Sequence, residues 1–267
     1  MHSARFLGNY ILYGLARLLD ACFHSPDIRF HPLRIAAGML TPLYFVIGVS
    51  PIFSAAGTML NWRVFLVGYA ALFVSGMYIF YPCDAPSLAL FSIGVFSLLR
   101  NRMPEVFTAM ALMMLFRESA FHLVVLAAMW SATCRVENPA RRLAWIFILA
   151  SFFVIEYKLI RFWFPGPLTG TGQLLLSREI FTGGALLSPT SLVTLPLVAL
   201  PPLVYLCVRN PDQTGVSLDK FFLLNCLAVP LWLIFYRVLG GNITEFRLLW
   251  PVLLPIIYGI AWIPWRP

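Results

Sequence analysis

The chain has 267 residues, of which 60% are hydrophobic and only 11% are charged. In soluble domains about a quarter of all residues are charged, so the composition excludes an ordinary soluble protein. The net charge of +8 comes mostly from arginine, which in membrane proteins anchors cytoplasmic loops and makes nucleic acid a poor partner. The five cysteines show no paired short spacing, so neither a zinc site nor a disulfide framework is indicated.

Long apolar runs recur along the whole chain, and they are continuous rather than alternating. This pattern predicts an all-α, polytopic helical bundle and disfavours a β-barrel. We expect about 7–9 membrane segments at roughly 20 apolar residues each. Residues 1–34 are expected to form an amphipathic N-terminal segment and residues 35–267 a single transmembrane domain, with no evident cleavable signal peptide.

The first helical pattern covers residues 6–23 and is interrupted by Arg17 and Asp20. It fits an amphipathic helix lying in the membrane interface, and the alternative is a poor first transmembrane helix. A polar connection at 25–34 follows. The first full span is expected at 35–53, where two internal prolines are tolerated if neighbouring groups satisfy the carbonyls that they free.

Six further spans are expected, at residues 62–80, 87–99, 143–164, 195–208, 221–238 and 248–265. Tyr81–Pro86 is expected to be a turn, because each residue before a proline is pushed out of the helical region. Residues 165–194 are expected to form a long irregular loop. Short turns are expected at 210–212 and 240–242.

The stretch at 103–133 is almost entirely apolar, yet Arg117, Glu118 and His122 lie at its centre. A charged side chain in hydrocarbon costs roughly 2.5–3.5 kcal/mol on insertion scales, so such residues usually face a protein interior or a cavity. On one helix Glu118 and His122 would share a face. These residues indicate a site around which the chain is organised.

The arginine clusters at 100–102 and 135–142 are expected to be cytoplasmic. The stretch between them would then enter and leave the membrane on one side, with about fourteen residues, or roughly 21 Å, in each half. That length predicts a hairpin of two broken helices with Arg117 and Glu118 at its tip. A single tilted helix is the alternative, and it requires the spans on one side of the stretch to be inverted.

This topology places several arginines, carboxylates and one histidine near the external face. Arginine binds phosphate with two parallel hydrogen bonds, and a carboxylate can accept a proton from a sugar hydroxyl. The alternative is that these groups are ion pairs between helix ends. Asp84 could instead cap a helix, Glu245 could stabilise a helix dipole, and His122 could be a satisfied core residue. No phosphate-binding glycine loop, catalytic triad or metal cluster is recognisable, so the metal is unknown.

Three sequence motifs carry a resemblance to a known class. They are Tyr81-Pro82-Cys83-Asp84-Ala85-Pro86 followed by Leu98-Leu99-Arg100, then Phe116-Arg117-Glu118-Ser119, then Gly241-Asn242-Ile243-Thr244-Glu245-Phe246-Arg247. This pattern is similar to one in uncharacterised bacterial membrane proteins that resemble the GT-C class of polyprenyl-phosphate-sugar-dependent glycosyltransferases.

The resemblance implies a multi-pass GT-C-like fold of the bacterial inner membrane with an external cavity. The implied roles are phosphate binding by Arg34, Arg117 and Arg247, general base catalysis by Asp27 or Asp84, and orientation of the arginines by Glu118, Glu245 and His122. No organic cofactor is implied, and a divalent cation is an optional participant.

Two other function classes remain open. One is a non-catalytic membrane subunit that docks a larger membrane complex, which would copurify with protein partners. The other is a lipid or small-solute transporter, which should carry polar groups along a path to both faces. The expected partners are membrane lipids, including a polyprenyl-phosphate sugar, together with membrane proteins in the second case.

Overall fold

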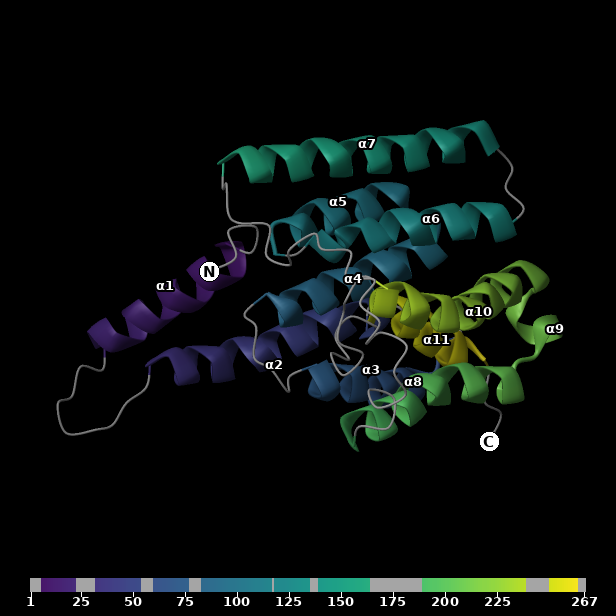
Figure 1. The fold of residues 1–267 in the computed structure, drawn as a ribbon, viewed down its shortest axis with the longest axis horizontal. Coiled ribbons are helices and arrows are strands. Elements are labelled where there is room, and N and C mark those ends of the chain that lie inside the picture. Colours follow the sequence, from purple (N-terminus) through teal and green to yellow (C-terminus); the bar gives the residue numbers. More distant parts are fainter. Residues whose placement is uncertain are drawn as a thin grey trace. The chain divides into compact units, whose positions relative to one another are not determined.

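The computed structural model describes residues 6–22, 32–53, 60–76, 83–116, 118–134, 139–163, 189–238 and 250–263 (Figure 1). Every regular element in these ranges is a helix, which confirms the predicted all-α class. The chain divides into two compact units. Unit 1 comprises Met1–Pro51, Met77–Val124 and Trp145–Pro167, and unit 2 comprises Ile52–Gly76, Val125–Ala144 and Leu168–Pro267. The division expected at residue 34 stays a prediction.

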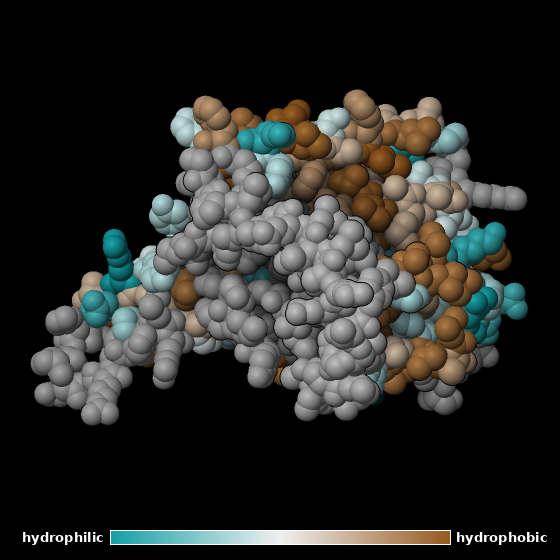
Figure 2. All heavy atoms as spheres, in the orientation of Figure 1, coloured by the Kyte–Doolittle hydropathy of each residue, from teal (hydrophilic) through white to brown (hydrophobic). Residues whose placement is uncertain are grey.

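Three helical segments in the described ranges are long and apolar enough to cross a membrane: Ile35–Phe53 with 19 residues, Pro139–Ile160 with 22 and Val216–Leu233 with 18. Hydrophobic side chains also lie on the surface (Figure 2). Among them, Phe147 is 72% exposed and Val67 is 71% exposed. Soluble proteins rarely expose extensive apolar patches, so both features indicate a membrane protein.

Unit 1 begins with α1 (Phe6–Cys22) and α2 (Pro32–Phe53). Leu12 and Ala16 of α1 pack against Ala36 of α2. Arg17 and Asp20 of α1 are exposed, so the helix has the amphipathic pattern that the sequence predicted. The expected position of α1 in the membrane interface stays a prediction.

The proline near the end of α2 has its freed carbonyl satisfied locally. Pro51 has no N–H to donate to the carbonyl of Ile47, and the Ser50 hydroxyl donates to that oxygen over 2.7 Å. One residue on, the Ser92 hydroxyl donates to the carbonyl of Gly48 over 2.8 Å and joins α2 to the next helix of the unit. The Ser50 hydroxyl therefore replaces the helical hydrogen bond that Pro51 cannot make, and Ser92 adds a hydrogen bond between two helices.

α4 (Asp84–Leu99) is the most buried helix of unit 1, with small residues along most of its length. The expected turn through Pro86 is wrong at its C-terminal end, because the helix already begins at Asp84. Proline is tolerated in a first helical turn, where its missing N–H has no helical acceptor to lose. Proline disfavours a helical conformation in the residue before it, but here that restriction did not move the start of α4 past Pro86.

α4 ends in a Schellman motif centred on Asn101, which has a positive φ of 59°. The N–H of Asn101 donates to the carbonyl of Leu98 over 2.9 Å, and the N–H of Arg102 donates to that of Ser97 over 2.8 Å. This is the hydrogen-bond pattern with which a left-handed residue ends a helix. The chain turns within these residues and enters α5 (Met103–Met114), which packs along α4.

The central stretch is two helices and not one. α5 ends at Met114, the short 3₁₀ helix η2 covers Glu118–Ala120, and α6 covers Phe121–Thr133. A Cβ atom on Gly94 of α4 would lie 2.8 Å from Leu123 and 3.5 Å from Ala109. In one continuous helix those two residues would lie about 21 Å apart along the axis and could not both meet Gly94. The chain therefore folds back at this point, as the hairpin prediction required.

α7 (Pro139–Trp163) contacts both halves of this hairpin through aromatic rings. Within unit 1, the Phe152 ring lies 4.6 Å from that of Phe107 in α5, and the Phe153 ring lies 6.2 Å from that of Phe121 in α6. α7 begins before the span expected at 143–164, because a proline fits the first helical position.

Unit 2 is built around α11 (Trp250–Trp262), in which every residue from Trp250 to Ala261 is buried. α3 (Trp62–Gly76), α8 (Pro189–Val208) and α10 (Val216–Val238) pack against it. α8 takes up the last residues of the loop expected at 165–194, and residues 164–188 lie outside the described ranges. The Phe65 and Tyr258 rings, 4.5 Å apart, join α3 to α11.

Glycine allows α11 to approach its neighbours closely. A Cβ atom on Gly259 would lie 2.7 Å from the Phe222 ring of α10, and one on Gly68 of α3 would lie 2.8 Å from Ile257. Both distances are shorter than real Cβ contacts, so neither position has room for a methyl group.

Gly259→Ala is expected to lower the free energy of unfolding by about 1–3 kcal/mol, the usual cost of overpacking a core. The matched control is Gly38→Ala in α2, where a new Cβ would meet nothing within 4 Å. That change should stabilise the helix by about 0.5–1 kcal/mol, because alanine is the better helix former. Thermal unfolding of the purified variants in detergent measures both effects. Equal melting temperatures for the two variants would contradict the close packing of α11.

Candidate functional site

The structure describes only part of the predicted site. The side chains of Asp84 and His122 are described. Arg34 lies in α2 and Glu118 in η2, although nothing is described of their side chains. The remaining predicted residues, Asp27, Arg117, Glu245 and Arg247, lie outside the described residues.

Asp84 is the first residue of α4 and is 0% exposed. The capping position belongs to Cys83, whose side chain makes no capping hydrogen bond, so Asp84 does not occupy the N-cap. The Ser87 hydroxyl donates to the carbonyl of Cys83 over 2.6 Å and closes this first turn from within the helix. Asp84 thus lies in the first turn of α4, at the positive end of the helix dipole.

His122 is 2% exposed and lies at the start of α6. Its Nδ1 lies 2.7 Å from the carbonyl oxygen of Ser119 in η2. Because a carbonyl can only accept, Nδ1 carries the hydrogen, and Nε2 is the acceptor when the ring is neutral. His122 thus ties η2 to α6, and its expected role in orienting arginines stays a prediction.

The junction between η2 and α6 separates Glu118 from His122. Glu118 belongs to a 3₁₀ helix and His122 to an α-helix, so they do not lie on one continuous α-helix. A four-residue spacing gives a shared face only along an unbroken α-helix. The side chain of Glu118 is not described, so the shared face expected for this pair stays a prediction.

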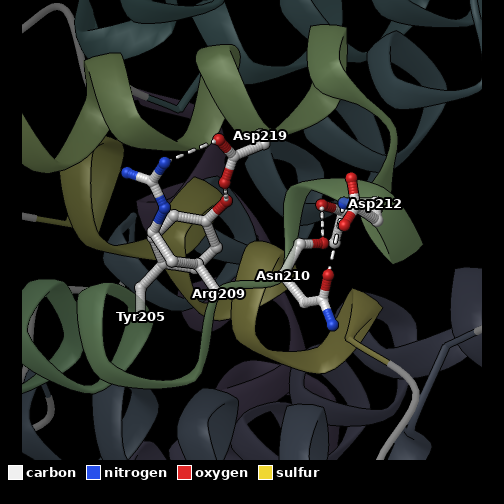
Figure 3. A network of polar contacts seen from close by, with 6 residues as sticks. Tyr205, Arg209, Asn210, Asp212 and Asp219 are labelled. Carbon is white, nitrogen blue, oxygen red and sulfur yellow. Dashed lines mark hydrogen bonds and ion pairs between the residues drawn. The ribbon is translucent and has the colours of Figure 1, made fainter.

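A second polar cluster, in unit 2, was missed by the sequence analysis (Figure 3). The Tyr205 hydroxyl of α8 donates to Oδ1 of Asp219 over 2.9 Å, and Nη2 of Arg209 lies 3.2 Å from Oδ2 of the same carboxylate. The Asp219 side chain is only 6% exposed, whereas that of Arg209 is 31% exposed. Both carboxylate oxygens are satisfied, so the cluster joins α10 to the end of α8.

The connection between these helices is itself held by hydrogen bonds. Asn210 caps the one-turn helix α9 (Pro211–Thr214), and its Oδ1 accepts from the N–H of Asp212 over 3.2 Å (Figure 3). The Thr214 hydroxyl donates to the carbonyl of Asn210 over 2.8 Å. Asp219 could have been noticed from the sequence, because an ionisable residue inside an apolar helix usually has a partner.

A third cluster lies at the connection between α4 and α5, outside the three candidate spans. The Ser97 hydroxyl donates to Oε2 of Glu105 over 2.8 Å, and Nη1 of Arg102 lies 3.0 Å from Oε1. The hydrogen bond from Ser97, helped by the charge of Arg102, lowers the pKa of the Glu105 carboxyl. The Arg102 and Glu105 side chains are about half exposed, so solvent screens this pair.

Metal ligation was left unknown by the sequence. Among the described residues, no group of three or more histidine, cysteine, aspartate or glutamate side chains could hold a metal ion. None of the five cysteines is joined in a disulfide. Neither observation assigns a metal to the predicted site.

Comparisons of the chain with family models, with curated proteins and with solved structures found no match. The resemblance to the GT-C class therefore rests on the motifs quoted above.

Tyr205→Phe should lower the free energy of unfolding by about 1.5–3 kcal/mol, because Asp219 loses a hydrogen bond to a charged group. Asp219→Asn should cost a similar amount, since it removes the charge opposite Arg209. A double-mutant cycle on thermal unfolding in detergent measures the coupling between the two side chains. If the two losses simply add, Tyr205 and Asp219 do not interact as described.

Ser97→Ala should raise the pKa of Glu105 toward its ordinary value, because it removes the largest cause of the lowering. A carboxyl whose pKa is lowered in the folded state contributes stability above its unfolded pKa and loses it as pH falls through the folded value. A carbon-13 titration of labelled Glu105 in the wild type and in Ser97→Ala measures the change. Identical titration curves would exclude the role of Ser97, and Ser92→Ala, which removes a hydroxyl from the same helix, is the control.

Proposed function

We propose that the chain is a GT-C-like membrane glycosyltransferase, or a polyprenyl-phosphate-sugar-binding protein, of the bacterial cell envelope. It would be a multi-pass protein of the inner membrane with about 7–9 membrane segments, at roughly 20 residues per span. The three apolar helices of spanning length support the coarser part of this proposal.

The observation that carries the proposal is the break in the chain between α5 and α6. α5 has 12 residues and α6 has 13, so each is about 18–20 Å long and too short for a bilayer core of about 30 Å. Polar backbone at membrane depth is tolerated where it is buried in protein or lines a cavity. The Arg117-Glu118 motif falls in this break. We propose that charged side chains at the break bind the charged headgroup of a lipid.

The proposed chemistry is a displacement at the anomeric carbon of the donor sugar. The oxygen of the acceptor hydroxyl bonds to that carbon, the bond from the carbon to the phosphate oxygen breaks, and polyprenyl phosphate leaves with the bonding electrons. The hydroxyl proton passes to the carboxylate of Asp27 or Asp84. Arg34, Arg117 and Arg247 would hold the phosphate, and Glu118, Glu245 and His122 would orient these arginines.

The test compares four variants in cells: Arg117→Lys, Arg117→Ala, Asp27→Asn and Asp84→Asn. Lysine keeps the charge of Arg117 but lacks its planar fork, so Arg117→Lys should accumulate normally and lose glycan product. One of the two asparagine variants should do the same, because it lacks the base. Protein abundance in the membrane and transfer of labelled sugar from polyprenyl phosphate are measured together.

A structural role for Arg117 predicts a different pattern. Arg117→Ala would then break a buried pair at a cost of roughly 3–5 kcal/mol and reduce the amount of protein. Normal product from all four variants at normal abundance would end the glycosyltransferase proposal at this site. A copurifying membrane complex would in that case favour the docking subunit.

A further inference from the structure

Four helices of unit 2 meet at one end of the unit, around Phe222 of α10. The Phe222 ring lies 5.7 Å from that of Tyr205, near the end of α8, and a Cβ atom on Gly259 of α11 would lie 2.7 Å from it. The N–H of Asn61 donates to the carbonyl of Ala261 over 2.7 Å, which places the start of α3 beside the end of α11. The starts of α3 and α10 and the ends of α8 and α11 therefore lie together.

The end of α6 and the start of α7 lie at the same place. The ring of Trp130, in the last turn of α6, lies 5.1 Å from that of Phe221 in α10. The guanidinium carbon of Arg142, in the first turn of α7, lies 5.9 Å from the centre of the Trp130 ring. These parts of α6 and α7 belong to unit 2, so every contact in this arrangement is made within one unit.

Basic residues gather at this end. The described ranges of unit 2 contain six basic residues, and five of them lie here: Arg63 in α3, Arg141 and Arg142 in α7, Arg209 after α8, and Lys220 in α10. We call these five residues the basic end of unit 2. The sixth, Arg237, lies near the opposite end of α10. Both acidic residues of these ranges, Asp212 and Asp219, also lie at the basic end, where Asp219 is paired with Arg209 (Figure 3).

Helix dipoles do not account for this distribution. Basic side chains stabilise the carboxyl end of a helix, where the dipole is negative. Arg63 lies in the first turn of α3, and Arg141 and Arg142 lie in the first turn of α7, where the dipole is positive. Their charge is unfavourable to the helix at these positions, and a negatively charged surface outside the unit would offset that cost.

The exposed side chains of the basic end have the composition of a membrane interface. Arg63, Arg141 and Lys220 are exposed. The guanidinium carbon of Arg63 lies 5.5 Å from the centre of the Trp62 ring, and Trp62 is 50% exposed. Tryptophan is enriched where helices leave the membrane, and lysine and arginine are in excess on the cytoplasmic side. This end therefore agrees with the cytoplasmic side expected for the arginine cluster at 135–142.

We propose that the basic end of unit 2 lies at the cytoplasmic leaflet and binds the headgroups of anionic phospholipids through Arg63, Arg141 and Lys220. Anionic lipids give that leaflet a negative surface potential, and each lysine or arginine near it strengthens binding about fivefold. Headgroups without net charge lack this attraction. The proposal does not depend on the glycosyltransferase proposal, because none of these three residues belongs to the site proposed there.

Native mass spectrometry of the full chain tests the lipid preference. The purified protein is mixed with equal amounts of phosphatidylglycerol, which is anionic, and phosphatidylcholine, which has no net charge, and the lipids that it retains are counted. The wild type should retain mainly phosphatidylglycerol, and the preference should weaken as salt is added, because salt screens exposed charges. Equal retention of the two lipids by the wild type would overturn the proposal.

Variants locate the binding surface. The double variant Arg141→Gln with Lys220→Gln should lower the preference for phosphatidylglycerol on the order of twentyfold, and Arg63→Gln alone about fivefold. The matched control is Lys158→Gln, which removes an exposed lysine from unit 1 and should keep the preference of the wild type. An unchanged preference in both the double variant and Arg63→Gln, or an equal loss in Lys158→Gln, would show that the lipid binds elsewhere and overturn the proposal.

The side of the membrane is measured separately. Asp212 is exposed in α9, at the basic end. Asp212→Cys is made in a chain whose two exposed cysteines, Cys22 and Cys207, are replaced by serine. An impermeant maleimide should label this variant in inverted membrane vesicles and leave it unlabelled in right-side-out vesicles. Labelling only in right-side-out vesicles would place this end outside the cell and contradict the proposal.

Discussion

Hydrogen bonding between helices that are almost wholly apolar is the constraint on which the rest of this structure depends. A polar group buried in such helices has no water to bond with and must find its partner within the protein. The Ser92 hydroxyl donates to the carbonyl of Gly48. Tyr205 and Arg209 both bind the carboxylate of Asp219. His122 bonds to the carbonyl of Ser119. Apolar packing alone tolerates sliding, whereas each of these bonds fixes one helix against the next at a particular residue.

Much of the helical architecture could be predicted, because a continuous apolar run has few alternatives to a helix. The starts of helices were predicted less well than their ends. α4, α7 and α8 begin at Asp84, Pro139 and Pro189, each before the expected apolar run. Proline is usually a signal that a helix stops, but in a first turn it removes no helical hydrogen bond. Hydropathy identifies the part of a helix in the membrane and not the turn that precedes it.

The candidate site could be predicted only where local sequence controls the geometry. Arg117 and Glu118 in an apolar stretch indicated a break, and the helices do end on either side of it. The bond from His122 to Ser119 depends on the switch from 3₁₀ to α-helix, which residue spacing does not reveal. The pairing of Tyr205 with Asp219 spans a connection whose path is set by the cap at Asn210. The sequence alone therefore does not show that these two residues are in contact.

The central place of α11 in unit 2 has a consequence for how the protein is made. Its neighbour α3 ends at Gly76, whereas α11 begins at Trp250, so the ribosome completes most of the chain between them. At about 5–20 residues per second, that interval is roughly nine to thirty-five seconds. During it, Phe65 and Tyr69 of α3 lack the ring of Tyr258, against which Phe65 packs in the finished structure. α4 and α5 can pair as soon as both are inserted, but unit 2 has to wait for its last helix. That waiting interval is when α3 depends most on lipid or an insertion chaperone to shield its packing face.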